Sequence, residues 1–93
     1  MTLKVPQFSI KIKNIKGLHA RASAKLVEVV ESHNANATIS KDSMSASGDS
    51  IMGLLMLAAP FESFIEVETS GPDADLLAEA LRALVTEKFG EEA

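Results

Sequence analysis

The chain has 93 residues, of which 46% are hydrophobic, so we expect one folded domain, 1–93, with an ordered core over about 7–89. It has no cysteine, no signal-peptide core in its first residues and no apolar run approaching the ~18 residues of a membrane span, so we expect a cytoplasmic protein that does not insert into a membrane. With 9 basic and 13 acidic residues, its formal net charge of −4 argues against a nucleic-acid partner.

The first part of the chain changes from a strand pattern to a helix pattern. Residues 8–13 alternate strictly, with Phe8, Ile10 and Ile12 on one side, which predicts a half-buried strand. Gly17 interrupts the pattern before a predicted amphipathic helix from Ala20 to about His33. The residues expected on the buried face of this helix are Ser23, Leu26, Val27 and Val30.

The start of this helix lacks an ordinary cap. Residues 18–22 include no Ser, Thr, Asp or Asn to accept hydrogen bonds from the first free backbone N–H groups, although Ser23 could cap a shorter helix. The free N–H groups of Ala20 and Arg21 and the helix dipole would suit an anion, above all a phosphate. A nucleophilic imidazole, His19, and the guanidinium of Arg21 beside it suggest a phosphate that is carried rather than merely bound.

The middle of the chain predicts a hairpin and a short helix. Residues 35–40 alternate, 41–43 resemble a turn, and 44–47 form a short partner strand. Ser50, with Asp49 as a competitor, is expected to cap an apolar helix from Ile51 to Leu57. Leu54 and Leu57, with Ile51 as a further candidate, are its expected core residues.

The last third predicts a strand over 64–69, with Ile65 and Val67 inward, and a second long helix. The apolar stripe of that helix is Leu76, Leu77, Ala80, Leu81, Leu84 and Val85. Gly90 would end the helical region, and the acidic residues that follow it are interpreted as a solvated, frayed tail. The order β-α-β-β-α-β-α favours an α+β fold in which helices cover one face of an antiparallel sheet.

Two segments resemble the motifs of one family. Gly17-Leu18-His19-Ala20-Arg21, followed by Ala24 and Leu26-Val27, resembles the active-site signature of the HPr family, the histidine phosphocarriers of the bacterial phosphoenolpyruvate phosphotransferase system. Residues 49–57 look like the regulatory-serine motif of that family. The resemblance covers roughly 8–89 and implies an open-faced β-sandwich, a four-stranded antiparallel sheet with three helices on one face.

The resemblance also implies a function. A phosphoryl group would pass from phosphorylated enzyme I to Nδ1 of His19 and then to an EIIA-type protein, with Arg21 pairing the phosphate. Ser50 would be the regulatory site of an HPr kinase/phosphorylase. Such a protein is a carrier rather than an enzyme, and it needs neither a cofactor nor a metal. The partner-docking residues implied are Ile51, Met52 and Leu55, and Lys25 could steer acidic partner surfaces or simply be solvated.

The chain departs from the usual family pattern in three places and leaves alternatives open. Ala22 stands where many members have proline, and the glycine usual near Glu62 is absent. The Ala-Arg-Ala-Ser-Ala run, 20–24, looks more like the carriers of nitrogen-related systems than like sugar-uptake versions. One alternative is a regulatory protein of the same fold that acts through the Ser50 patch without phosphoryl relay. Another is an unrelated small α+β binding module in which the histidine is incidental.

Overall fold

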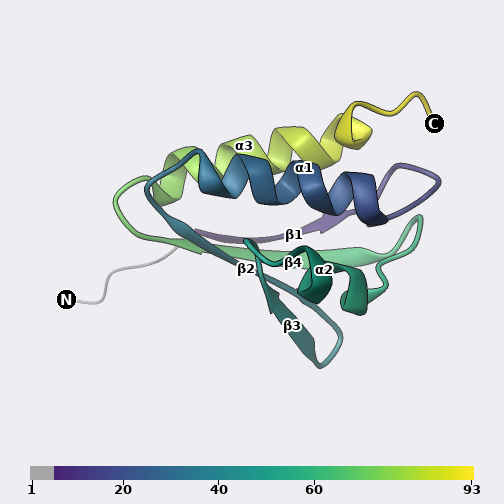
Figure 1. Ribbon diagram of the computed structural model, residues 1–93, viewed down its shortest axis with the longest axis horizontal. Helices are drawn as coiled ribbons and strands as arrows, with labels where there is room; N and C mark the ends of the chain where they lie inside the picture. The colour runs from purple at the N-terminus through teal and green to yellow at the C-terminus, as the bar shows by residue number, and fades with distance from the viewer. Residues whose placement is uncertain (1–5) are drawn as a thin grey trace.

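The computed structural model describes residues 6–93, and its four strands form one antiparallel sheet with the order β1-β4-β2-β3. The strands are β1 (Gln7–Lys11), β2 (Asn36–Lys41), β3 (Met44–Ser47) and β4 (Phe64–Ser70). Helices α1 (Ala20–Glu31) and α3 (Ala74–Thr86) lie side by side over one face of the sheet, and the short α2 (Ile51–Leu57) packs against β3 and α1 (Figure 1). The predicted α+β fold is confirmed.

The strands alternate as their sequences predicted, and their inward side chains form the floor of the core. Ile10 of β1 lies opposite Ile65 of β4, and Ile39 of β2 lies opposite Val67 of β4. All four are buried, and each such side chain contributes roughly 1.5–3 kcal/mol through its removal from water. The polar residues between them are mostly exposed on the other face, so the sheet is covered on one side only.

The buried face of α1 matches the predicted one, but that of α3 differs at several positions: Ala80 and Leu84 are only partly buried, and Ala74 and Ala78 are buried although they were not predicted to be. Leu76 is 65% exposed although its sequence pattern placed it in the apolar stripe. It precedes the fully buried Leu77 by one residue, which turns it about 100° around the helix, out of the interface. The residues of α3 that are buried are Ala74, Leu77, Ala78, Leu81 and Val85.

The prediction of a frayed tail after Gly90 is wrong. A 3₁₀ turn, η1 (Lys88–Gly90), follows α3 and buries Phe89 completely. Beyond it, the backbone N–H of Ile15 donates to the carbonyl oxygen of Ala93 at 3.1 Å, which fixes the last residues against the loop before α1. The predicted domain, 1–93, remains a prediction, because residues 1–5 lie outside the described part of the chain.

The loop before β4 keeps a left-handed turn without the glycine that the family usually has there. Glu62 itself adopts φ +72°, a conformation that glycine accepts without steric cost. The turn is held by its backbone, because the N–H of Glu62 donates to the carbonyl of Ile12 at 2.8 Å. Ser63 adds a side-chain bond from Oγ to the carbonyl of Pro60 at 2.7 Å.

Candidate functional site

The start of α1 is uncapped, as its sequence predicted. His19 occupies the N-cap position with extended backbone, φ −80° and ψ −176°, and its side chain makes no capping hydrogen bond. The alternative that Ser23 caps a shorter helix is wrong: Ser23 lies inside α1, and its hydroxyl donates to the carbonyl of Leu18 at 3.3 Å. The first turn also contains no acidic residue. The N-terminal end of α1 therefore keeps its partial positive charge for a ligand.

The loop before His19 is held from two sides. Gly17 has φ +68°, and its carbonyl accepts a hydrogen bond from Nδ2 of the fully buried Asn14 at 2.7 Å. On the other side, the N–H of Leu18 donates to the carbonyl of Ala59 at 2.9 Å. A Cβ atom on Gly17 would lie 2.5 Å from that same oxygen, which explains why glycine is required at this position.

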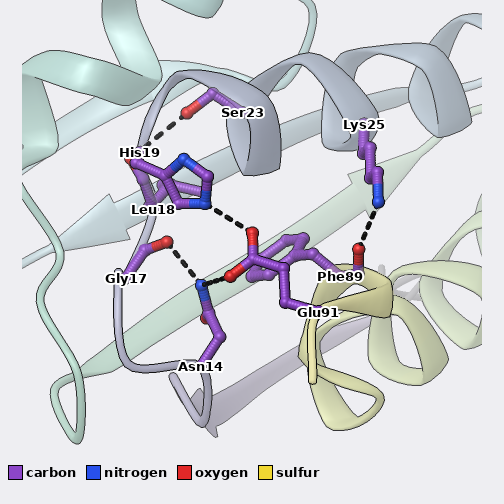
Figure 2. Close-up of polar contacts among 8 residues, drawn as sticks. All are labelled: Asn14, Gly17, Leu18, His19, Ser23, Lys25, Phe89 and Glu91. Carbon is purple, nitrogen blue, oxygen red and sulfur yellow. Dashed lines mark hydrogen bonds and ion pairs between the residues drawn. The ribbon is translucent and has the colours of Figure 1, made fainter. Parts of the chain in front are cut away.

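The imidazole of His19 is paired with a carboxylate from the far end of the chain. Its Nε2 is hydrogen-bonded to Oε2 of Glu91, and Nδ1 lies on the side of the ring away from Glu91 (Figure 2). Glu91 also accepts a bond from Nδ2 of Asn14, at 3.0 Å on its other oxygen. The His19 side chain is 26% exposed and that of Glu91 is 15% exposed. An ionised carboxylate only accepts hydrogen bonds, so in this pair Nε2 of the ring is the donor.

Two opposing effects set the ionisation of Glu91. Its partial burial acts to raise the pKa of the carboxyl group, but the hydrogen bonds to His19 and Asn14, together with nearby positive charge, outweigh burial. The net result is a pKa below the ordinary value, so Glu91 is ionised at neutral pH. Sequence reasoning interpreted this residue as part of a solvated tail, and no local pattern pointed to it or to Asn14.

Arg21 and His19 line one open cavity of about 490 Å³ at this end of the molecule. Its walls are Lys16, His19, Ala20, Arg21, Glu91, Glu92 and Ala93. Arg21 is exposed, and within residues 6–93 it has no carboxylate within ion-pair distance. The cavity thus brings together an imidazole, a guanidinium and the first turn of α1, a combination that can receive a phosphate.

Ser50 caps α2 as predicted. Its Oγ accepts a hydrogen bond from the N–H of Gly53 at 3.0 Å, while the competing Asp49 instead accepts from the hydroxyl of Ser47 at 2.6 Å. Ser50 is partly exposed, so its hydroxyl group is not sealed in the core.

The residues expected to dock partners lie in two different settings. Ile51 is 40% exposed, so its candidacy as a core residue was wrong, and Met52 is 69% exposed. Leu55 lines a second hollow of about 320 Å³, which His19 also lines. Met56, which was not predicted as a docking residue, adds a further exposed apolar side chain to Ile51 and Met52 on α2. Lys25 is not simply solvated, because its Nζ donates to the carbonyl of Phe89 at 2.6 Å. Its docking role remains a prediction.

The other features of residues 6–93 add no second chemistry. At the end of α1, Nδ1 of His33 donates to the carbonyl of Val29 at 2.8 Å. Across residues 6–93 there is no group of three or more His, Cys, Asp or Glu residues placed to share a metal ion. Nor is any helix in that range both long and apolar enough to cross a bilayer.

Comparison with known proteins identifies the family. The model of the PTS HPr component phosphorylation site matches residues 6–87. The chain belongs to the HPr family. It is 42% identical over 80 residues to phosphocarrier protein HPr of Cupriavidus necator, covering 86% of this chain and 90% of the relative. It is 40% identical over 82 residues to phosphocarrier protein NPr of Shewanella violacea, covering 88% and 90%.

The fold comparison agrees with the sequence comparison. A crystal structure of HPr from Thermoanaerobacter tengcongensis superposes with a TM-score of 0.90 at 32% identity, covering 95% of this chain and 99% of that one. Membership of the HPr family places the protein among the phosphocarriers of the phosphotransferase system. The family resemblance inferred from Gly17 to Val27 and from 49–57 is therefore confirmed.

Proposed function

We propose that the protein accepts a phosphoryl group on Nδ1 of His19 from phosphorylated enzyme I and passes it to an EIIA-type protein. The observation that carries this proposal is the pairing of Nε2 with Glu91, which leaves Nδ1 as the ring nitrogen without a hydrogen-bond partner in the described residues. His19 shares its cavity with Arg21 and with the uncapped start of α1. A bare imidazole nitrogen is a nucleophile, and the other two groups favour an anion beside it.

The strength of these interactions suits a carrier. A helix terminus stabilises an adjacent surface anion by about 0.3–1 kcal/mol. A charge-assisted hydrogen bond from Arg21 adds roughly 1.5–3 kcal/mol. A phosphoryl group held this moderately can be received and then surrendered. We therefore propose that the protein is not itself an enzyme, that it needs no cofactor, and that alignment of donor and acceptor is supplied by its partners.

The test is phosphoryl transfer from phosphoenolpyruvate through purified enzyme I. The wild-type chain should become labelled, and the label should be lost in acid and survive base, as phosphohistidine does. His19→Ala should fold and take no label. His33→Ala is the matched control, because it removes the other histidine of the chain from the opposite end of α1, and it should label normally. Label retained by His19→Ala would overturn the assignment.

We propose regulation at Ser50 as a second part of the function. The hydroxyl is partly exposed at the start of α2, beside the exposed Ile51 and Met52. A phosphate there would add about −1.5 to −2 charges next to this apolar surface and would weaken docking of a partner. Incubation with an HPr kinase/phosphorylase and ATP should label the wild type and not Ser50→Ala. No label on the wild type, with label on a control carrier, would remove regulation at Ser50.

The exposed apolar surface of α2 also supports the alternative function, a regulatory binding protein of the same fold without relay. Kinase labelling of Ser50 combined with no labelling by enzyme I would favour it. The relatives include proteins named HPr and NPr at 42% and 40% identity, and we propose an EIIA-type protein as the acceptor. Both functions place the protein in the cytoplasm, without nucleic-acid or membrane partners.

A further inference from the structure

Segment 91–93 reaches back to the start of α1 and brings a carboxylate to His19. The two residues are 72 positions apart in the chain, yet Oε2 of Glu91 bonds to Nε2 of the imidazole (Figure 2). This contact involves the ring nitrogen that the proposed transfer does not use. It therefore calls for a role beyond that of the phosphate-binding groups Ala20 and Arg21.

We propose that Glu91 is a positioning residue for phosphoryl transfer, which holds the proton of His19 on Nε2 and stabilises the ring charge that develops when Nδ1 attacks phosphorus. This inference rests on the proposed function. It adds a residue from the C-terminal segment to a site otherwise built from the loop and first turn of α1. The physical logic is that of a catalytic triad, in which a carboxylate fixes the tautomer of a histidine and steadies the imidazolium.

Glu91 is held firmly enough to act in this way. Its Oε1 accepts from Nδ2 of Asn14 at 3.0 Å, and Asn14 is fully buried, so one oxygen is fixed while the other faces the ring. The segment is anchored on one side by the buried Phe89, whose carbonyl accepts from Lys25 at 2.6 Å. On the other side, Ala93 accepts from the backbone of Ile15 at 3.1 Å.

The proposed step requires no proton transfer. The Nδ1 lone pair forms the new N–P bond, and the P–N bond to the donor imidazole breaks, with its electron pair returning to that imidazole. The Nε2 proton stays on His19, so the phosphorylated ring carries a positive charge that the Glu91 carboxylate faces. The reverse order of bond changes releases the phosphoryl group to the acceptor.

The negative charge of Glu91 is offset where the phosphoryl group would arrive. Lys16 and Arg21 line the same cavity, and Glu91 bonds to the ring nitrogen opposite the one that is attacked. Exchange of the carboxylate for an amide should therefore lower the turnover of transfer more than it weakens binding of the donor.

The test compares Glu91→Gln and Glu91→Ala with Glu87→Gln, which removes the same charge from an exposed position at the end of α3. The first measurement is the tautomer of His19 by ¹⁵N NMR at about pH 8.5, where an imidazole is neutral. We expect the wild type and Glu87→Gln to carry the proton on Nε2, and Glu91→Ala to gain a population protonated on Nδ1. Thermal unfolding of each variant checks that the fold is kept.

The second measurement is the rate of His19 phosphorylation, both by enzyme I and by potassium phosphoramidate, a donor that needs no protein partner. Both Glu91 variants should lose roughly ten- to hundredfold in rate with either donor, the loss that one charge-assisted hydrogen bond implies. With enzyme I the loss should be in kcat, while KM is unchanged or lower.

The outcomes separate this inference from the function on which it rests. Unchanged tautomer populations and wild-type rates in both Glu91 variants would overturn the role of Glu91 and leave the carrier function standing. A wild-type chain that enzyme I does not phosphorylate would instead overturn the proposed function. Equal rate losses in Glu87→Gln would show a general charge effect and would also reject the positioning role.

Discussion

Helices α1 and α2 both begin after a residue with extended backbone, His19 in one case and Ser50 in the other. At Ser50 the side chain turns back and accepts a hydrogen bond from the N–H of Gly53. At His19 the side chain turns outward to Glu91, and it caps nothing. Similar backbone at two helix starts thus serves two ends: a capped start adds stability, whereas an uncapped one keeps its N–H groups available for an anion.

The largest effect is expected when α1 is given the capping residue of α2. His19→Ser should abolish phosphoryl acceptance, because no imidazole remains. It should also be more stable than His19→Ala by about 1 kcal/mol, because a serine hydroxyl can accept from the first turn. Labelling by enzyme I and urea unfolding of both variants measure the two effects. Equal stabilities would mean that the start of α1 cannot be capped.

The next effect concerns the charge beside the uncapped start. Arg21→Gln should slow phosphoryl transfer roughly ten- to hundredfold, because it removes one charge-assisted hydrogen bond to the phosphate. The matched control is Arg82→Gln, which removes the chain's other arginine; it lies over the ring of Phe8, 4.1 Å from the ring centre, and does not line this cavity. Transfer kinetics that Arg21→Gln leaves unchanged would contradict a role in phosphate pairing.

Two substitutions at Ser50 test separately what the cap of α2 contributes to stability and what a charge there does to docking. Ser50→Ala should destabilise the fold by about 1 kcal/mol, since the N–H of Gly53 loses its acceptor. Ser50→Asp should keep most of that stability, because a carboxylate also caps, while its charge weakens docking on Ile51 and Met52. Unfolding midpoints separate the cap from the charge. An unfolding midpoint of Ser50→Ala equal to that of the wild type would show that the capping hydrogen bond does not contribute to stability.

The smallest effect is the pH dependence of the unfolding free energy to which Glu91 contributes at the uncapped start of α1. Its pKa is lowered in the folded state, so its contribution to stability is fully present above the ordinary glutamate pKa of about 4.3 and is lost as the pH falls through the lower folded value. The difference in unfolding free energy between wild type and Glu91→Gln should shrink as the pH falls through that range. A difference in unfolding free energy that grows as the pH falls through this range would contradict the expected direction.

Local patterns predicted most of the fold and the centre of the site. Strict alternation located the strands, the lack of a capping residue predicted the uncapped start of α1 at His19, and Ser50 was predicted as the cap of α2. These features depend on neighbours within a few positions, which is the range over which periodicity and capping act. Leu76 was misplaced because a stripe of leucines does not define which of two adjacent positions faces the sheet.

The parts that escaped sequence reasoning depend on contacts between distant segments. Asn14 and Glu91 lie 77 positions apart, and Lys25 and Phe89 lie 64 apart. Gly90 was correctly interpreted as the end of a helical region, but the burial of Phe89 and the bond from Ile15 to Ala93 hold the following residues near His19. Nothing in the acidic composition of 91–92 distinguishes a carboxylate in solvent from one that faces an imidazole.

The contact at Gly17 limits how this protein can drift under mutation. Its Cα sits so close to Ala59 that even a methyl group would collide with backbone rather than with a movable side chain, and φ +68° adds strain for any other residue. The loop that leads to the histidine and the loop that leaves α2 are consequently locked face to face. In a saturation library selected for function, position 17 should tolerate glycine alone. Insertions in the loop before His19 and insertions in the loop after α2 should both be selected against.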